Sequence, residues 1–500
     1  MPYVSIWSDR LQRSINKVNA AKGLFVGYNA CIDFLEFLEP ASLTQIFANH
    51  MSDSLFARIK LKEIPRELQT QEDFLVALAS TIATGKAFQI PNRQNNLKSW
   101  WDKIFDEADE HRMGGQSGII ANLLGRLDVK TIISIPNLSP VQRRRFYKDN
   151  IYVPTVDLSG DSNSLILAPA SKTTFDGAIT KVNWIFEYEE GLHVNLRHNG
   201  EEWNIQAPRS NRLIIADRPP GLIPGFSDEV RPFLPELGKT VERAILSGYQ
   251  YLNKDNVEAQ MEVELADLQA FVSQNPDLRM HWEYASIRDE VVRDKLMDTL
   301  KQVIHSFGCN EIELRTVLED FGEEELVKAI KNEESGWNLY QGMRVVQEKL
   351  KLKRIHVHTL GYHMMCLDKD YSSQVSRKSA MNALLFSALV GTAKTLVGAF
   401  TTRNIRELEL HLASRNPVSY KGLRDMEGVA KEMQMAGMVS DYRDFMRTGC
   451  IKDKNQWVIL VPSQLTASDL LKSTVGLGDS ISSSAFVFDR RKPHTKTVDQ

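Results

Sequence analysis

Short apolar runs alternate with longer helical patterns along most of the chain, and this alternation constrains the fold more than any other feature. Runs of about four to eight apolar residues are typical of buried strands, while 288–305 and 376–396 have helical periodicity. Such alternation predicts an α/β fold with a mainly parallel central sheet, which binds ligands beyond the carboxyl ends of its strands. The runs expected to form strands are 24–28, 130–135, 212–216, 244–247, 279–286, 354–360 and 457–461.

Two stretches interrupt the alternation. The first carries helical patterns, one of which begins with a cap-like Thr70-x-x-Asp73, and the second carries short strands separated by turn signals. Because a parallel sheet rarely accommodates several hairpin-like strands, both stretches are assigned to a smaller α+β domain. The large domain is then expected at 1–33, 113–145 and 208–500, and the small domain at 34–112 and 146–207.

The charge balance limits the classes of partner. The 500 residues contain 61 Lys and Arg against 64 Asp and Glu, a formal net charge of −3. Nucleic-acid-binding proteins usually have a basic excess, so we expect no nucleic-acid partner. The four cysteines are far apart and form no C-x-x-C pair, which predicts a reducing, cytoplasmic compartment.

The most apolar stretch, 380–400, is interrupted by Lys394 and contains Gly, Ser and Thr. A membrane-spanning helix needs about 20 consecutive apolar residues, so this stretch predicts a buried helix of the protein core instead. The first residues lack the uninterrupted apolar segment of a signal peptide. We therefore expect no membrane association.

The motif that points most directly to chemistry is Gly476-Leu477-Gly478-Asp479, which precedes a helical run of small residues. Backbone N–H groups at such a helix start favour an anion, and glycine lets a ligand approach closely. Asp479 is placed to accept a proton from a hydroxyl group that attacks a phosphorus atom held by those amides. The alternative is that Asp479 only caps the helix, and G-x-G-D alone is a weak signal.

Two further motifs carry carboxylates. His281 and Glu283 are two residues apart on a predicted strand and share one of its faces. Asn310 and Glu313 share a face if a helix starts there. Since Mg²⁺ prefers carboxylate oxygens, often through water, Glu283 and Glu313 are candidates for a magnesium site. The alternative is that each pair is a solvated or satisfied polar group.

Two turns offer hydrogen-bonding groups for a small ligand. Asn29 and Asp33 follow the first predicted strand and supply the donors and acceptors that a polyol needs. Gly115 and Gln116 lie in a glycine-rich turn before a predicted helix, where backbone N–H groups can face a substrate. Both segments can equally be ordinary turns, in which Asn, Asp and Gly are common.

Cationic side chains could bind phosphate, because the arginine fork matches phosphate oxygens. The run 143–145 of three arginines is interpreted as a solvated helix face. No H-E-x-x-H, G-x-S-x-G or Walker A motif occurs. The remaining candidate cations are Lys172, Arg209, Arg212 and Arg218.

Taken in order, these motifs resemble those of the ADP-dependent sugar kinases of the ribokinase-like superfamily. The likeness extends from about residue 23 to residue 488, and it implies a ribokinase-like large α/β domain with a smaller α+β lid that closes on ADP and a sugar. The motifs are N-x-x-x-D, Gly-Gly-Gln, Asn-Arg, His-x-Glu, Asn-x-x-Glu and Gly-x-Gly-Asp, at 29–33, 114–116, 211–212, 281–283, 310–313 and 476–479.

The resemblance also implies roles for individual residues. Asp479 becomes the general base, and the amides of Gly476 and Gly478 become the anion hole for the β-phosphoryl group of ADP. Glu283 and Glu313 become the carboxylates that organise Mg²⁺, largely through water. The residues implied at the sugar or its phosphate are Asn29, Asp33, Gly115, Gln116, Lys172 and Arg212, and those near the adenine are Tyr362, Val461 and Pro462.

Within that family, the sequence is closer to the phosphofructokinase branch. Gln116 stands where glucokinases often have Asn, and 84–91 lacks the acid with which glucokinases bind a glucose hydroxyl. Cys31 replaces an Asn that is frequent in the family, so one contact to the sugar is expected to differ.

The sequence therefore predicts an ADP-dependent 6-phosphofructokinase. It would transfer the β-phosphoryl group of MgADP to the C1 hydroxyl of fructose 6-phosphate, giving AMP and fructose 1,6-bisphosphate in a modified glycolysis. An ADP-dependent glucokinase or a bifunctional sugar kinase is the alternative, and a non-catalytic nucleotide- or sugar-phosphate-binding protein is a more remote one. The choice of ADP over ATP rests on the resemblance alone.

Overall fold

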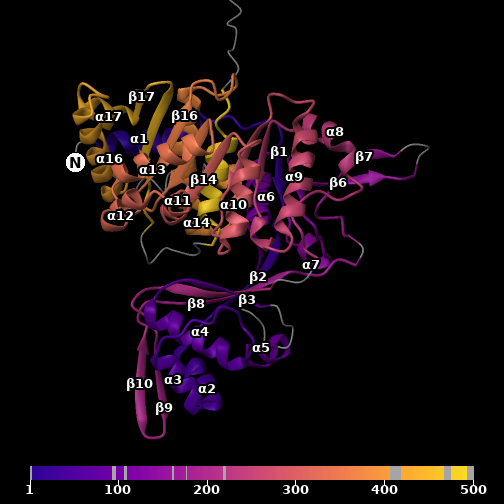
Figure 1. Cartoon of the computed structure of the whole chain (residues 1–500), viewed down its shortest axis with the longest axis vertical. Coiled ribbons are helices and arrows are strands. Elements are labelled where there is room, and N and C mark those ends of the chain that lie inside the picture. Colours follow the sequence, from indigo (N-terminus) through magenta and orange to yellow (C-terminus); the bar gives the residue numbers. More distant parts are fainter. Residues whose placement is uncertain are drawn as a thin grey trace, which may run out of the picture.

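The computed structural model describes residues 3–92, 97–105, 110–159, 163–175, 177–217, 221–405, 418–466 and 475–491. Within these residues the strands form an eleven-stranded sheet, a five-stranded sheet and a two-stranded hairpin. Figure 1 shows the small sheet below the large one, with its own helices and the hairpin at the far end.

The large sheet is mainly parallel. Seven adjacent strands, from β15 to β6, run parallel, and the strands outside them pair antiparallel. Every residue of β1, β5 and β12 is buried, as expected where helices cover both faces of a sheet. Across the sheet the order is β17 (Cys450–Asp453), β18 (Gln456–Pro462), β16 (Tyr362–Asp368), β15 (Arg354–His358), β14 (Ser306–Asn310), β13 (Arg279–Glu283), β12 (Arg243–Leu246), β1 (Leu24–Gly27), β5 (Thr131–Ser134), β6 (Ile151–Asp157) and β7 (Ser164–Pro169).

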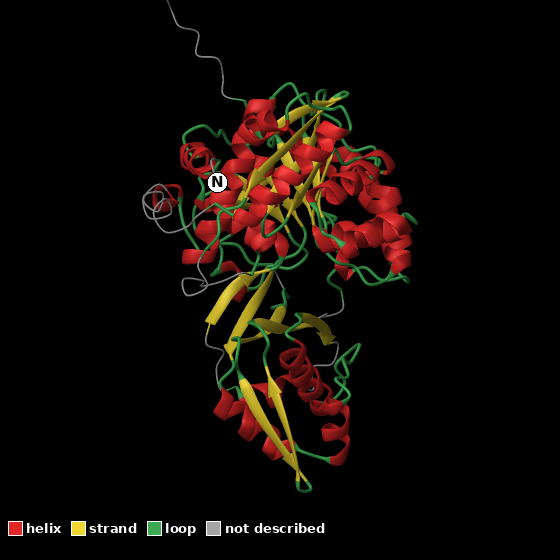
Figure 2. Cartoon of the chain, turned by 90° about the vertical axis from the view of Figure 1, so that its left-hand side faces the viewer, coloured by secondary structure: helices red, strands yellow, loops and turns green. Residues whose placement is uncertain are grey.

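Helices lie on both sides of this sheet, as Figure 2 shows by colour. The predicted α/β fold with a mainly parallel central sheet is therefore confirmed. The helices associated with the large sheet are α1 (Val4–Ser14), α6 (Gln116–Arg126), α7 (Pro140–Arg143), α8 (Leu234–Lys239), α9 (Val257–Val272), α10 (Glu290–Leu300), α11 (Glu311–Asp320), α12 (Glu324–Asn332), α13 (Gly336–Lys349), α14 (Arg377–Val397), α16 (Tyr420–Met435), α17 (Tyr442–Thr448) and α18 (Leu477–Val487), with 3-10 turns η2 (Arg231–Phe233) and η3 (Tyr249–Tyr251).

The small sheet packs one face against helices and has a separate core that includes Phe74, Trp101 and Phe186. The helix α4 begins with the predicted cap, in which Thr70 and Asp73 each accept a backbone N–H of the other. The strands are β3 (Phe88–Asn92), β11 (Asn211–Asp217), β8 (Val182–Tyr188), β2 (Cys31–Phe37) and β4 (Glu110–Gly114); the hairpin is β9 (His193–His198) with β10 (Glu201–Gln206); the helices are α2 (Pro40–His50), α3 (Asp53–Lys60), α4 (Gln71–Thr84) and α5 (Lys98–Ile104).

The structure differs from the predicted 146–207 insertion at both ends. Strands β6 and β7 belong to the large sheet, because β6 continues the parallel order beside β5 and buries Val153 there. Strand β11, predicted at 212–216 as part of the parallel sheet, lies in the small sheet between β3 and β8. Its Leu213 and Ile215 are buried in the small core, whereas the alternating residues Arg212 and Ile214 are only half-buried.

The predicted helix at 376–396 is α14. It is long and apolar enough to span a membrane by length and composition, but 78% of its most apolar window is buried inside the protein. It packs against α18, with Gly391 facing the side chain of Ile481. The helix is thus a core helix, in agreement with the prediction.

Candidate active site

The carboxyl ends of the parallel strands bring most of the predicted site residues to one edge of the large sheet. Asn29 follows β1, Glu283 ends β13, and Asn310 ends β14. The first turn of α18 lies at the same edge, because a Cβ atom on Gly478 would be only 2.7 Å from Nε2 of His358, the last residue of β15. This is the edge at which α/β sheets bind ligands.

The start of α18 has the geometry of an anion site. Gly476 is the N-cap residue and has a φ of 68°, a left-handed conformation that favours glycine. A Cβ atom there would also approach to 2.7 Å from Cδ1 of Ile119 on α6. Because Gly476 holds the N-cap position, Asp479, three residues further on, is not the N-cap residue. The amides at this helix start are the groups that favour an anion.

Asp479 lies beside residues of the predicted sugar site. Burial raises the pKa of Asp479 to about 6, while a hydrogen bond from Gln116 and the positive charge of Lys394 lower it and the charge of Asp33 raises it. A carboxyl group with a pKa near the working pH is suited to accept a proton and release it again. The interpretation of Asp479 as a general base therefore has physical support beyond the motif.

Glu283 is 3% exposed and interacts closely with other polar groups. Its Oε2 atom is 2.9 Å from Nε2 of His281, which also lies 3.2 Å from Oγ of Ser482 on α18. Burial raises the pKa of Glu283 well above its ordinary value, and the negative charge of Asp479 adds to this. His281 is neutral, because burial lowers its pKa well below its ordinary value.

Glu313 has a structural role that the sequence interpretation missed. It accepts the backbone N–H of Asn310 at 2.9 Å, and Asn310 accepts the N–H of Glu313 at 2.9 Å, which makes a capping box at the start of α11. The signal was present in the sequence as N-x-x-E before a helical run. Burial, reinforced by the charge of Asp479, raises the pKa of Glu313 to about 8.

The three carboxyl groups fit a cation. Asp479 raises the pKa of both Glu283 and Glu313, so this edge of the sheet gathers like charges. Among the described residues, no three His, Cys, Asp or Glu side chains converge as direct ligands of a metal ion. The arrangement therefore suits a cation that is held largely through water, as Mg²⁺ often is.

The predicted sugar residues lie together between the two sheets. Asn29 receives hydrogen bonds at Oδ1 from Tyr251 and, at 3.4 Å, from Lys181. Asp33 on β2 accepts from Nδ2 of Asn183 at 2.9 Å, and burial raises its pKa. Lys181 and Asn183 were missed by the sequence interpretation, because each is a single polar residue without a motif.

The loop from Gly114 to Gln116 completes this region. Gly115 has a φ of 73°, and a Cβ atom on it would lie 2.6 Å from the backbone oxygen of Asn29. A Cβ atom on Gly114 would collide with the carboxylate of Asp33. Both glycines are thus needed for the close approach of this loop to the end of β1 and to β2, and the loop then places Gln116 beside Asp479.

Of the predicted cations, Arg212 lies at the sugar region, whereas Lys172 and Arg209 have other surroundings. Burial raises the pKa values of Asp33 and Glu187, and the positive charge of Arg212 offsets part of that rise in both, which places Arg212 at the sugar region. Lys172 is exposed, and within the described part of the chain no contact joins it to the other predicted site residues. Arg209 donates to the backbone oxygen of Gly85 at 2.7 Å. The fourth candidate, Arg218, lies outside the described residues.

The residues predicted near the adenine lie at the same edge. Tyr362 begins β16 and pairs with Pro462 at the end of β18, while His363 pairs with Val461. The ring and hydroxyl group of Tyr362 are buried, and its oxygen has no hydrogen-bond partner among the described residues. The structure therefore brings Tyr362, Val461 and Pro462 together beside the end of β15.

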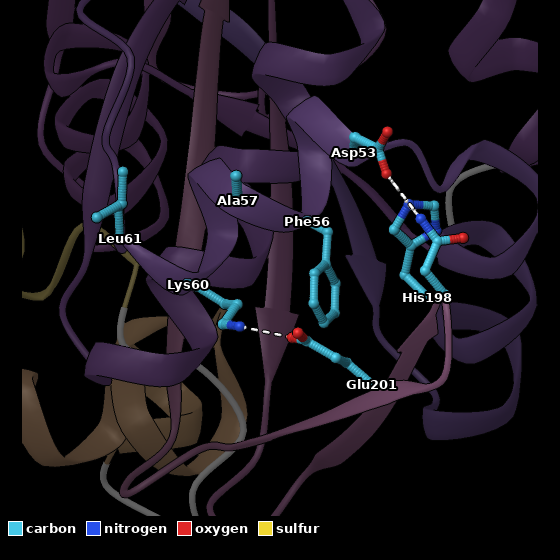
Figure 3. Close-up of a pocket in the computed structure, with 8 residues that line it drawn as sticks. Asp53, Phe56, Ala57, Lys60, Leu61, His198 and Glu201 are labelled. Atoms are coloured by element: carbon cyan, nitrogen blue, oxygen red, sulfur yellow. Dashed lines mark hydrogen bonds and ion pairs between the residues drawn. The ribbon is translucent and has the colours of Figure 1, made fainter.

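A separate pocket lies far from this edge, on the small domain between α3 and the β9–β10 hairpin (Figure 3). Phe56 lies at its centre, Lys60 pairs with Glu201 at 2.7 Å, and His198 lies 2.6 Å from Asp53. None of the predicted site residues lines it. We assign it no part in the chemistry.

Comparison with known proteins agrees with this geometry. The conserved-region model of the ADP-specific phosphofructokinase/glucokinase family matches residues 22–488. An ADP-specific phosphofructokinase of Methanosarcina acetivorans is 32% identical over 93% of this chain and 92% of its own. An ADP-dependent glucose/glucosamine kinase of Pyrococcus furiosus is 28% identical over 96% and 97% of the two chains.

A solved structure of an ADP-dependent kinase in complex with fructose 6-phosphate and ADPβS is also similar. It has a TM-score of 0.79 and 31% identity, over 97% of this chain and 96% of its own. The match of the conserved region covers most of the chain, and the ordered motifs meet at one edge of the sheet. The chain therefore belongs to the ADP-specific phosphofructokinase/glucokinase family.

Proposed function

We propose that the protein is an ADP-dependent 6-phosphofructokinase, which transfers the β-phosphoryl group of MgADP to the C1 hydroxyl of fructose 6-phosphate. The observation that carries the proposal is the position of Asp479, at the start of α18 and next to Gln116 of the sugar loop. One carboxylate thus faces both the anion site and the acceptor. Relatives described as ADP-specific phosphofructokinases, at 27–32% identity, support the acceptor.

The proposed reaction is an in-line transfer. The C1 hydroxyl oxygen attacks the β-phosphorus atom, and its proton passes to Asp479. The bond from that phosphorus to the bridging oxygen breaks, and AMP leaves with the electron pair. The amides of Gly476 and Gly478 hold the phosphoryl oxygens throughout, which stabilises the charge that spreads over them in the transition state.

Mg²⁺ would be held, largely through water, by Glu283 and Glu313, and would neutralise charge on the phosphate oxygens. Glu283 is oriented by the neutral His281, and Glu313 by the backbone of Asn310. These contacts fix both carboxylates before the nucleotide arrives. Tyr362, Val461 and Pro462 would lie against the adenine.

The sugar phosphate would be bound between the two sheets. Asn29 comes from the large sheet, whereas Asp33, Asn183 and Arg212 come from strands of the small one. The positive charges of Lys181 and Arg212 favour an acceptor that already carries a phosphate. Since the two sides of the site come from different sheets, we infer that the small domain closes on the substrates as a lid and excludes water. None of the four cysteines, all of which lie in the described residues, forms a disulfide, in keeping with the cytoplasm.

The test is the formation of AMP by the purified chain with MgADP and either fructose 6-phosphate or glucose. We expect AMP and fructose 1,6-bisphosphate in equal amounts, with a kcat/KM for fructose 6-phosphate at least about 100-fold above that for glucose. Preference for glucose would assign the protein to the glucokinase alternative, which the Pyrococcus furiosus glucose/glucosamine kinase represents among its relatives. Nucleotide binding without turnover of either sugar would favour a non-catalytic binding protein.

A further inference from the structure

Lys394 is the one lysine or arginine between Ala380 and Val397 on α14, the helix that fills the core beneath the site. The helix packs on α18 so closely that a Cβ atom on Gly391 would lie 3.1 Å from Ile481 and 3.5 Å from Leu477. Lys394 follows one turn after Gly391, toward the carboxyl-terminal end of α14. It therefore lies beside the first turn of α18, where the anion site is.

Charged residues on several elements lie close enough to act on the ammonium group of Lys394. Asp479 on α18 and Asp33 on β2 attract its charge, while Arg112 on β4 and Arg126 on α6 repel it. Its charge in turn lowers the pKa of Asp479. The charged groups that act on Lys394 thus include both the general base Asp479 and the sugar carboxylate Asp33.

The ammonium group has no hydrogen bond or ion pair with any residue that the structure describes, although the side chain is largely buried. Burial lowers its pKa, and the repulsion of Arg112 adds to this. A buried charge without a partner is unfavourable, so such a group is expected to meet a ligand of opposite charge. The anion site at Gly476 and Gly478 is where that ligand arrives.

We propose that Lys394 is a further catalytic residue, which contacts the phosphoryl group during its transfer from ADP to the acceptor. This inference rests on the proposed kinase function. In an in-line transfer, negative charge spreads over the equatorial oxygens of the phosphoryl group, and a fixed cation there stabilises the transition state more than the bound substrates. Lys394 supplies that cation.

The position of Lys394 assigns it to the transferred group rather than to the 6-phosphate of the sugar. Its charge acts on Asp479, which takes the proton of the attacking hydroxyl, and its helix packs on the first turn of α18, so we place it near the point of attack. Lys181 contacts Asn29, and Lys181 and Arg212 are the cations that act most strongly on Asp33, so we assign the 6-phosphate to these two. Removing Lys394 should therefore reduce kcat and change the KM of fructose 6-phosphate little.

The test compares Lys394→Met with a matched control on the same helix. Lys378→Met removes an exposed lysine from the first turn of α14 and should leave activity unchanged. We expect Lys394→Met to lower kcat about 10²–10³-fold, the usual loss for one transition-state contact, with both KM values within about threefold of the wild type. Lys394→Arg should recover about tenfold or more of that loss, because it restores the charge and not the packing shape.

Two results would overturn the proposal. One is an unchanged kcat in Lys394→Met. The other is an increase in the KM of fructose 6-phosphate with kcat retained, which would assign Lys394 to the binding of the sugar phosphate instead. If Lys394→Met does not fold, Lys394→Arg and Lys394→Gln provide the comparison, and equal kcat values for these two would likewise contradict the proposal. A wild-type protein without turnover would contradict the proposed kinase function itself, whereas an active wild type with unimpaired variants contradicts only the role of Lys394.

Discussion

The two edges of the large sheet both bury charge, but in opposite ways. At the amino ends of β12 and β15, Arg243 and Arg354 both approach Phe486, and Arg243 pairs with Asp489 at 3.0 Å. At the carboxyl ends, Asp479, Glu283 and Glu313 are like charges, and Asp479 raises the pKa values of both glutamates. Helix α18 joins the two edges, since Asp479 is in its first turn and Asp489 follows its end.

The difference shows which edge is built for stability and which for ligands. The opposite charges of Arg243 and Asp489 compensate each other without any other molecule, although such a pair contributes modestly to stability. Like charges that meet repel one another, and they favour the binding of a cation and a substrate. A change at the carboxyl edge should therefore alter catalysis with little loss of stability, and a change at the amino edge should do the reverse.

The largest expected effect is that of Asp479→Asn. Loss of the general base should reduce kcat by a factor of about 10²–10⁴, while the KM for fructose 6-phosphate and the affinity for MgADP stay within about threefold. Steady-state kinetics and calorimetric titration measure the two quantities. The control is Asp444→Asn, an exposed acid on α17, which should behave as the wild type. Near-normal turnover of Asp479→Asn would remove the assignment of the base.

Arg243→Met tests the opposite edge. Removing one partner of a buried ion pair leaves Asp489 unpaired, so the free energy of unfolding should fall by about 3–5 kcal/mol. Urea denaturation provides the measurement, and kcat of the folded variant should stay within about threefold of the wild type. Arg13→Met removes an exposed partner of Asp9 and should cost less than about 1 kcal/mol. A large loss of kcat without loss of stability would contradict the division of roles.

Glu283→Gln probes the carboxyl edge without removing the base. The Mg²⁺ concentration for half-maximal activity should rise about 10–100-fold, as is usual when a group that orients a metal is lost. Stability without metal should not fall, because the substitution removes one of three like charges. Glu290→Gln changes an exposed acid on α10 and is the matched control. An unchanged Mg²⁺ requirement would exclude Glu283 from the metal site.

The smallest effect is that of pH. Asp479 has a pKa of about 6 and must be unprotonated to accept the hydroxyl proton. The value of kcat/KM should therefore rise with pH through about 6 and fall about tenfold per pH unit below it. A pH–rate profile from pH 5 to 8 measures this limb, and a profile that is flat between pH 5 and 7 would contradict the environment described for Asp479.

Much of this site could be predicted from the sequence, because its residues occur in motifs at strand ends and helix starts. Asp479, Glu283 and Asn29 were found in this way, and the structure places all three at one edge. Lys181 could not be found, since a single lysine carries no periodic or spacing signal, and Lys394 was noted only as the charge that interrupts an apolar helix. Only the packing of α14 on α18 and the approach of the small sheet give these two cations their neighbours.

Prediction of the fold from the sequence has the same limit. Apolar runs predicted the parallel strands, whose residues are buried on both faces. They did not show which sheet the strand at 211–217 joins, because Leu213, Ile214 and Ile215 form a continuous apolar run in either setting. Nor did turn signals show that β6 and β7 extend the large sheet, since a hairpin looks alike in both domains.

The central claim is that the carboxyl edge transfers a phosphoryl group from ADP to a phosphorylated sugar. The most direct test is the rate of fructose 1,6-bisphosphate formation from fructose 6-phosphate and Mg²⁺ with ADP, ATP or pyrophosphate as the donor. We predict rapid product formation with ADP, accompanied by equimolar AMP, and rates at least about 100-fold lower with the other two donors. Equal or faster product formation with ATP would contradict the account.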